Sequence, residues 1–229
     1  MTRLAAARVF GGDVPDDQPA WIEIDDGRVV DAGLGRPAGA RDLGDHFLAP
    51  GYVDLQVNGF GTTDFATAST DEAVALVEQL RSFGVTACCP TLVSAPLDSY
   101  APALERIAAA AQKTDAIVGV HLEGPFLGGA PGAHDVSVLR PADVDWLRGL
   151  LTRFPGLIRV VTLAPEADPG YEATRLLVEH GVTVALGHST TSYDEARAGA
   201  DAGATLVTHL FNGMGPLHHR APGLPGAAL

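Results

Sequence analysis

The sequence predicts an α/β protein built as a (β/α)8 barrel, of which about six β/α units are present, preceded by a small N-terminal β domain. Two observations predict this fold. From residue 49 onward, apolar runs typical of strands alternate with amphipathic helical stripes. Three of the helices end at a glycine that the next strand follows directly, at Gly84, Gly181 and Gly203. This alternation is typical of parallel strands joined by crossover helices.

Residues 1–49 form the predicted N-terminal β domain, and residues 50–229 form the partial barrel. Two runs with strand character, residues 20–24 and 28–32, flank the turn signal Asp25-Asp26-Gly27. We therefore expect a β-hairpin within a small sheet. Because an isolated hairpin is marginally stable in water, it needs further strands as partners.

The barrel begins with a predicted strand at residues 52–58, which places Asp54, Gln56 and Asn58 on one face because side chains alternate along a strand. The remaining elements are predicted as strands at residues 85–93, 117–123, 157–163, 182–186 and 205–208, and as helices at residues 69–84, 97–113, 141–153, 170–180 and 192–203.

Two of these helices begin with a capping-box signal, a serine followed three residues later by a glutamate, at Ser69 and Ser192. A third helix is expected to start at Pro141, which suits a first turn. A complete barrel needs about 250 residues, and 180 residues follow residue 49. We therefore expect the last two strands to lie beyond Leu229. A doubly wound open sheet is the competing fold, although no GxGxxG motif follows the first strand.

Composition excludes several classes of function. The net charge is −13, with 15 lysines and arginines and no basic cluster, so the chain has no electrostatic footprint for nucleic acid or an anionic membrane surface. No segment has the length and apolarity of a membrane span or a signal peptide, and we expect a cytoplasmic protein. The two cysteines, Cys88 and Cys89, are expected to be buried strand residues.

Three predicted strands end at residue types that bind metal ions: Glu123, His188 and His209. Because the carboxyl ends of parallel strands share one face, we expect the three side chains to lie close together. One carboxylate and two imidazoles form a zinc-type site that leaves a position open for water. The alternative is that the histidines are hydrogen-bonded residues of the core.

Five short motifs occur in order along the chain: APGYVDLQVNG at residues 49–59, HLEGPF at 121–126, GAH at 132–134, GHS at 187–189 and THLFN at 208–212. Together with residues 216–229, they resemble the N-acetylglucosamine-6-phosphate deacetylases of the amidohydrolase superfamily. The resemblance implies a homodimeric enzyme that hydrolyses N-acetylglucosamine 6-phosphate to glucosamine 6-phosphate and acetate, with water activated by a divalent metal ion, zinc.

The resemblance implies one metal ion per subunit, bound by Glu123, His188 and His209. Many amidohydrolases hold a second ion with a His-x-His pair at the end of the first strand. This chain has Gln56 and Asn58 there, neutral amides that bind such ions poorly. The two amides either hydrogen-bond neighbouring loops or contact the substrate.

The resemblance also implies how the substrate is held. His134, with Ala133 beside it in a glycine-rich loop, polarises the acetyl carbonyl; a solvent-exposed loop histidine is the alternative. Backbone groups at Asn212 and Gly213 contact the phosphate. Arg220 also contacts it, by reaching across a dimer interface into the neighbouring subunit's site.

The general acid/base of the family is an aspartate at the end of a later strand, which we expect beyond Leu229. Asp54 is the one aspartate predicted to face inward on an early strand, and we expect it to support the site. The 229-residue chain alone is therefore expected to be inactive. Two other interpretations stay open: another amidohydrolase, dihydroorotase-like or deaminase-like, and a metal-binding or dimerising protein without catalysis.

Overall fold

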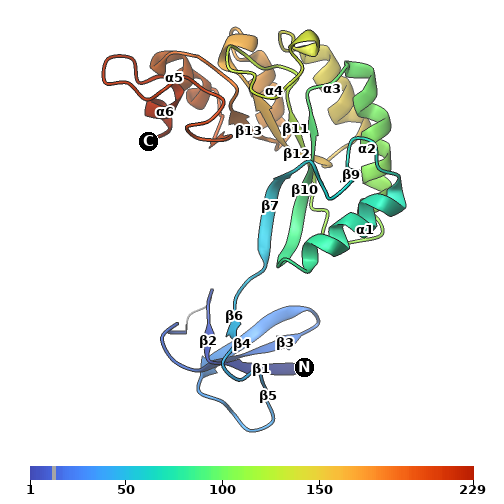
Figure 1. Cartoon of the computed structure of the whole chain (residues 1–229), viewed down its shortest axis with the longest axis vertical. Helices are drawn as coiled ribbons and strands as arrows, with labels where there is room; N and C mark the ends of the chain where they lie inside the picture. The colour runs from blue at the N-terminus through green and yellow to red at the C-terminus, as the bar shows by residue number, and fades with distance from the viewer. Residues whose placement is uncertain (12–13) are drawn as a thin grey trace. The chain divides into compact units, whose positions relative to one another are not determined.

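The computed structural model describes residues 1–11 and 14–229, which form two compact units, Met1–Tyr52 and Val53–Leu229. Figure 1 colours the chain from the blue N-terminus to the red C-terminus. The boundary between the units falls inside the first predicted strand of the barrel. Among the described residues, no helix combines the length and the apolar character needed to span a membrane.

The first unit is built on a four-stranded sheet with the order β4-β3-β1-β5. Strands β3 and β4 form the predicted hairpin, which turns at Asp26 and Gly27, both with positive φ. β1 pairs antiparallel with β3 and parallel with β5, so the hairpin has the partners it needs. The strands of this unit are β1 (Thr2–Ala6), β2 (Arg8–Val9), β3 (Ala20–Asp25), β4 (Arg28–Leu34), β5 (Arg41–Asp42) and β6 (Phe47–Leu48).

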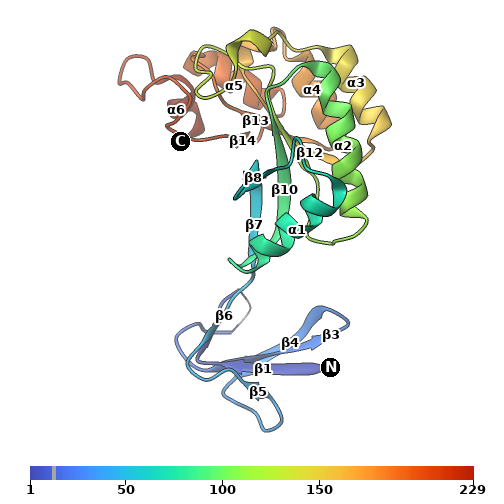
Figure 2. The ribbon, with the colours of Figure 1, turned by 45° about the vertical axis from the view of Figure 1, so that its right-hand side comes forward.

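The second unit contains a six-stranded sheet whose strands follow the chain order, β7-β10-β11-β12-β13-β14. Every neighbouring pair from β10 to β14 is parallel. The sheet curls, and α1 to α4 lie along one side of it (Figure 2). A doubly wound sheet reverses its strand order at a switch point, which this sheet does not do. The predicted incomplete barrel is confirmed.

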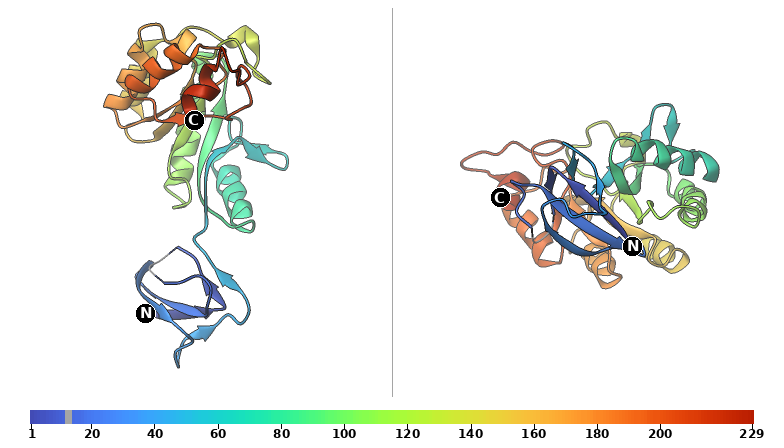
Figure 3. Two further views of the ribbon diagram at one scale, coloured as in Figure 1. Left: turned by 90° about the vertical axis from the view of Figure 1, so that its left-hand side faces the viewer. Right: turned by 90° about the horizontal axis from the view of Figure 1, so that it is seen from below.

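The elements of the second unit have the following bounds. Its strands are β7 (Tyr52–Val57), β8 (Gly59–Phe60), β9 (Thr63–Asp64), β10 (Val85–Val93), β11 (Val120–Glu123), β12 (Ile158–Leu163), β13 (Thr183–Leu186) and β14 (Leu206–Val207). Its helices are α1 (Thr70–Arg81), α2 (Leu97–Ala111), α3 (Val144–Arg153), α4 (Glu172–Glu179), α5 (Tyr193–Asp201) and α6 (Gly223–Ala228), with short 3-10 turns η1 (Val136–Val138) and η2 (Pro165–Ala167). Helix α6 packs against α5, and both can be followed in Figure 3.

Helix starts follow local side-chain chemistry. The capping boxes predicted at Ser69 and Ser192 are both present. The predicted start of α3 at Pro141 is wrong, because the helix begins at Val144. Asp143 caps it by accepting a hydrogen bond from the backbone N–H of Trp146 at 3.0 Å, and Pro141 lies in the preceding loop.

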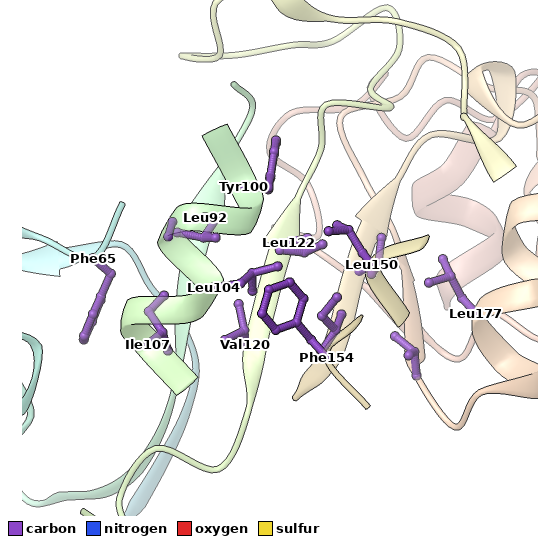
Figure 4. Packing of buried hydrophobic residues seen from close by; sticks show 14 of the residues in the cluster. Phe65, Leu92, Tyr100, Leu104, Ile107, Val120, Leu122, Leu150, Phe154 and Leu177 are labelled. Atoms are coloured by element: carbon purple, nitrogen blue, oxygen red, sulfur yellow. The ribbon is translucent and has the colours of Figure 1, made fainter. Parts of the chain in front are cut away.

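The core of the second unit lies between the sheet and its helices. Figure 4 shows residues of α2 packed beside β10 and β11, with α3 and α4 next to them. Leu104 of α2 and Leu122 of β11 are at most 1% exposed. Cys88 and Cys89 are buried in β10, as predicted, and burial raises the pKa of the Cys88 thiol to about 12. This packing fixes the strand ends at which the polar residues gather.

Candidate metal centre

Glu123, His188 and His209 meet at the carboxyl ends of β11, β13 and β14. Oε1 of Glu123 lies 3.0 Å from Nε2 of His188 and 2.9 Å from Nε2 of His209. One potential ligand atom from each residue lies within 4.8 Å of the others. Glu123 and His188 are buried, whereas His209 is exposed. The structure therefore brings the three predicted ligands together, although they are separated by up to 86 positions in the chain.

Both histidines lie where the backbone turns sharply after a strand. His188 has φ 51° and His209 has φ 53°, in the left-handed region that few residues other than glycine adopt. Sparsely populated backbone conformations of this kind cluster at functional sites. Gly213 passes close by with φ 60°, and a Cβ at this position would lie 3.1 Å from Nδ1 of His188. A larger residue here would have to adopt a positive φ, and the His188 ring would have to shift by a few tenths of an ångström.

The hydrogen bonds of His188 test whether these residues fit a metal ion. Its Nδ1 lies 3.2 Å from the carbonyl oxygen of Ala130. A carbonyl can only accept, so in the neutral ring Nδ1 carries the proton and Nε2 presents a lone pair to Glu123, 3.0 Å away. A lone pair and a carboxylate oxygen repel at this separation unless a cation lies between them or a second ring proton on Nε2 donates to Glu123. Ligand atoms of a tetrahedral zinc ion are about 3.3 Å apart, so the residues fit such an ion.

Burial and the neighbouring polar groups together set the charge of the site. Burial opposes ionisation of Glu123, but the interactions with His188 and Gln56 outweigh it and lower the pKa of the carboxyl to about 2. The pKa of His134 is also lowered, first by burial and then by the neighbouring His188, so its ring is neutral at neutral pH. The cluster thus combines one anionic carboxylate with imidazole nitrogens, the donor types that divalent zinc prefers.

A cavity of about 560 Å³ opens over the three residues. Its wall also contains Gln56, Asn58, Ala133, His134, Asn212 and Gly213. Gln56 Nε2 lies 3.3 Å from Nε2 of His209. His134 Nε2 lies 3.7 Å from Oε2 of Glu123, and the His134 side chain is only 6% exposed. This burial excludes the alternative of a solvent-exposed loop histidine.

The remaining predicted residues lie elsewhere. Arg220 lines a separate groove of about 930 Å³ beside the start of α5, together with His218. Its phosphate contact in a neighbouring subunit stays a prediction. Asp54 uses its Oδ1 to accept a hydrogen bond from the backbone N–H of Gln56 at 3.0 Å. Within the described ranges, Asp135 is the aspartate on the cavity wall, and its Oδ1 accepts the N–H of Ser137 at 2.9 Å.

Sequence and structure comparisons place the chain among known proteins. No protein-family model matches it. It is 41% identical over 226 residues to the N-acetylglucosamine-6-phosphate deacetylase of Bos taurus, an alignment that covers 95% of this chain and 53% of the bovine protein. The crystal structure of the N-acetyl-D-glucosamine-6-phosphate deacetylase from Mycobacterium smegmatis superposes on the whole chain with a TM-score of 0.93 at 38% identity, covering 61% of that enzyme.

Over the part of them that it spans, the chain is similar to N-acetylglucosamine-6-phosphate deacetylases. It spans about half the length of the curated relatives it matches. The N-acetylgalactosamine-6-phosphate deacetylase of Escherichia coli O157:H7 is also similar, with 34% identity over 220 residues, 93% of this chain and 58% of that protein. The similar proteins are therefore named for two different sugar phosphates, which are epimers.

Glu166 is a residue beside the candidate metal centre that sequence reasoning missed. Its Oε1 accepts hydrogen bonds from the backbone N–H groups of Gly129, at 3.0 Å, and Thr190, at 2.9 Å. Its Oε2 accepts from the hydroxyl of Ser189 at 2.5 Å. Glu166 therefore ties the loop that leads to His134 to the loop that follows His188. The sequence did contain a signal for Glu166. It lies just after the predicted strand at residues 157–163, much as Glu123 lies at the end of the predicted strand at residues 117–123.

A buried polar chain supports the floor of the site. His121 Nδ1 donates to the carbonyl oxygen of Leu55 at 3.0 Å, and its Nε2 lies 2.7 Å from the hydroxyl of Thr162. The Thr162 hydroxyl lies 2.7 Å from that of Thr208, the neighbour of His209 in the chain. Burial lowers the pKa of His121 to about 4, so the ring is neutral. The network links β7, β11 and β12 to the turn that carries His209.

Replacing Glu166 by alanine is expected to weaken zinc binding by about 10- to 100-fold, the usual effect of losing a group that orients a ligand. The physical reason is that the loops bearing His134 and His188 lose their shared acceptor. Hydrogen exchange measures this directly, because the amides of Gly129 and Thr190 should lose protection. The matched control is Glu172→Gln at the exposed start of α4. If both amides kept their protection in Glu166→Ala, the hydrogen bonds to Glu166 would not be what holds the two loops together.

Proposed function

We propose that the protein is a zinc-dependent cytoplasmic deacetylase of amino-sugar catabolism that hydrolyses the acetamide of N-acetylglucosamine 6-phosphate to glucosamine 6-phosphate and acetate. The observation that carries the proposal is the convergence of Glu123, His188 and His209 on one cavity whose wall also contains His134. The similarity to N-acetylglucosamine-6-phosphate deacetylases supports it. The cavity is large enough for a phosphorylated monosaccharide, because small-molecule sites usually measure about 300–1,000 Å³.

The residues divide the chemistry among them. A divalent ion bound by Glu123, His188 and His209 supplies a nucleophilic water of lowered pKa. His134 donates a hydrogen bond to the acetyl oxygen as negative charge develops on it, a contribution that is typically worth 10²–10³ in kcat. The buried carboxylate of Glu123 stays anionic throughout, since its pKa is about 2.

In this proposal the substrate phosphate is held by the part of the cavity wall formed by Asn212 and Gly213. The backbone N–H of Asn212 already donates to the carbonyl oxygen of His209 at 2.5 Å. The side-chain amide of Asn212 and the backbone of Gly213 are therefore the groups left to meet the ligand. Arg220 adds the positive charge from the partner subunit of a homodimer, since a guanidinium can bind two phosphate oxygens at once.

N-acetylgalactosamine 6-phosphate is a second candidate substrate. The observation that favours it is the similarity to the deacetylase of Escherichia coli O157:H7 that is named for this sugar. The two substrates differ only in the configuration at one hydroxyl, so the metal centre and His134 would act identically on both. Selectivity would come from the groups on the wall that meet this hydroxyl, and the Asn58 amide is a polar group on that wall.

The test measures binding and turnover separately on the zinc-loaded chain. Isothermal titration with each sugar phosphate should show saturable binding, and replacing His134 by asparagine should weaken it while zinc content stays unchanged. Acetate release should be far slower than that of the full-length bovine relative, because hydrogen bonds from Ser137 lower the pKa of Asp135, the aspartate on the cavity wall, and make it a weaker base. Acetate release at the relative's rate would contradict the expected lack of a general acid/base. Zinc binding without binding of either sugar would instead support a metal-binding protein without this activity.

A further inference from the structure

Two histidines of the cavity, His134 and His188, both turn their Nε2 atoms toward the carboxylate of Glu123. The rings of His134 and His188 lie with centroids 4.5 Å apart at 73° to each other. In both, Nε2 faces the carboxylate of Glu123, at 3.7 Å for His134 and 3.0 Å for His188. Their Nδ1 atoms face protein groups, and these groups decide what each Nε2 offers to the cavity.

The partner of His134 Nδ1 is Ser94, the residue that directly follows β10. The Ser94 hydroxyl lies 2.8 Å from Nδ1, and the Ser94 backbone N–H points at the same atom from 3.3 Å. A backbone N–H can only donate, so Nδ1 must present its lone pair. The neutral ring then carries its proton on Nε2. In the opposite tautomer two N–H groups would point at each other in a part-buried position.

The partner of His188 Nδ1 has the reverse polarity, because it is the carbonyl oxygen of Ala130. His188 therefore has a lone pair on Nε2, whereas His134 has a proton there. The same residue type is set to accept a cation at one position and to donate a hydrogen bond at the other.

We propose that Ser94 is a positioning residue that holds His134 in the Nε2–H tautomer, so that His134 presents a hydrogen-bond donor to the cavity. In this tautomer His134 can donate a hydrogen bond to the acetyl oxygen. The importance of Ser94 for catalysis therefore rests on the proposed deacetylase function. It also separates His134 from the metal ligands, since an Nε2 that carries a proton has no lone pair for an ion. Ser94 acts only through His134. The carbonyl oxygen of Glu123, 3.5 Å from the Ser94 hydroxyl, is an alternative acceptor for this hydroxyl.

The experiment is a two-bond proton–nitrogen correlation spectrum of the ¹⁵N-labelled chain, recorded without metal in mildly alkaline buffer so that the imidazoles are neutral. The pattern distinguishes a protonated from an unprotonated ring nitrogen. The variant His134→Asn assigns the signals by removing them. His121 is the internal control, because its Nδ1 donates to the carbonyl of Leu55 and should show the opposite pattern.

The expected result is an unprotonated Nδ1 and a protonated Nε2 in His134. In Ser94→Ala, which keeps the backbone N–H and loses the hydroxyl, the ratio of the two tautomers should shift by roughly fivefold, as the loss of one ordinary hydrogen bond implies. Ser94→Thr should restore the original ratio. A proton on Nδ1 of His134 in the unmodified chain would overturn the proposal even if Ser94→Ala failed to fold, and so would an identical ratio in Ser94→Ala. Neither zinc nor sugar enters the measurement, so its outcome is separate from the test of deacetylation.

Discussion

Replacing Glu123 by glutamine is expected to leave the chain folded and to lower its affinity for added zinc by more than 100-fold. The amide keeps the shape of the side chain but removes the one negative charge among the three proposed ligands. Losing a group that only orients a ligand costs about 10- to 100-fold, and losing a ligand should exceed that range. Zinc per chain is measured by plasma mass spectrometry, and the dissociation constant by competition with a chromophoric chelator.

The matched control is Glu78→Gln, an isosteric change at an exposed glutamate of α1 that pairs with Arg81 at 3.1 Å. It should bind one zinc ion with unchanged affinity. Circular dichroism of both variants checks that the fold is kept. If Glu123→Gln retained full zinc occupancy at the original affinity, Glu123 would be a structural carboxylate, and the ion would be held by other groups.

Truncation of Leu104 to alanine is expected to destabilise the barrel unit by about 2–5 kcal/mol, because it opens a cavity where no water can enter. Leu104 is 0% exposed and lies in α2, at the centre of the cluster in Figure 4. Urea unfolding of the larger unit can be followed by the fluorescence of Trp146, whose ring lies 5.3 Å from that of Tyr100. A Trp21→Phe background removes the tryptophan of the first unit from the signal.

The control for this prediction is Leu34→Ala, at a leucine of β4 that is 50% exposed. Exposed substitutions usually change stability by no more than about 0.5 kcal/mol. A loss smaller than about 1 kcal/mol in Leu104→Ala would mean that α2 is loosely packed. The sheet would then not depend on this helix to hold the strand ends in place.

The sequence predicted the parts of the site that depend on strand direction alone. Glu123, His188 and His209 each lie at or just after a strand end, and parallel strands bring such residues together in any barrel. The repeating order of strand, helix and glycine can also be recognised from short stretches of sequence. The strands of the curled sheet lie in this same order. The start of α3 was misplaced because Asp143 competed with Pro141 for the first turn, and capping strength decided the boundary.

The residues that orient the site could not be predicted in the same way. Ser94 and Glu166 act through loops that fold back over the sheet, and nothing in a strand pattern states where such a loop goes. The role of Glu166 is visible only in the structure, where the backbone amides of Gly129 and Thr190 both lie within 3.0 Å of its Oε1 atom. The groove that holds Arg220 depends on the path of residues 213–223, which no periodicity describes.

The most direct test of the account is an anomalous difference map collected at the zinc absorption edge from crystals of the zinc-loaded chain. We expect a single peak bound by a carboxylate oxygen of Glu123 and by Nε2 of both His188 and His209, at about 2.0–2.2 Å from each. His134 should remain outside the coordination shell with Ser94 against its Nδ1. A zinc peak at another site, or one that lacks any of these three ligands, would contradict the account.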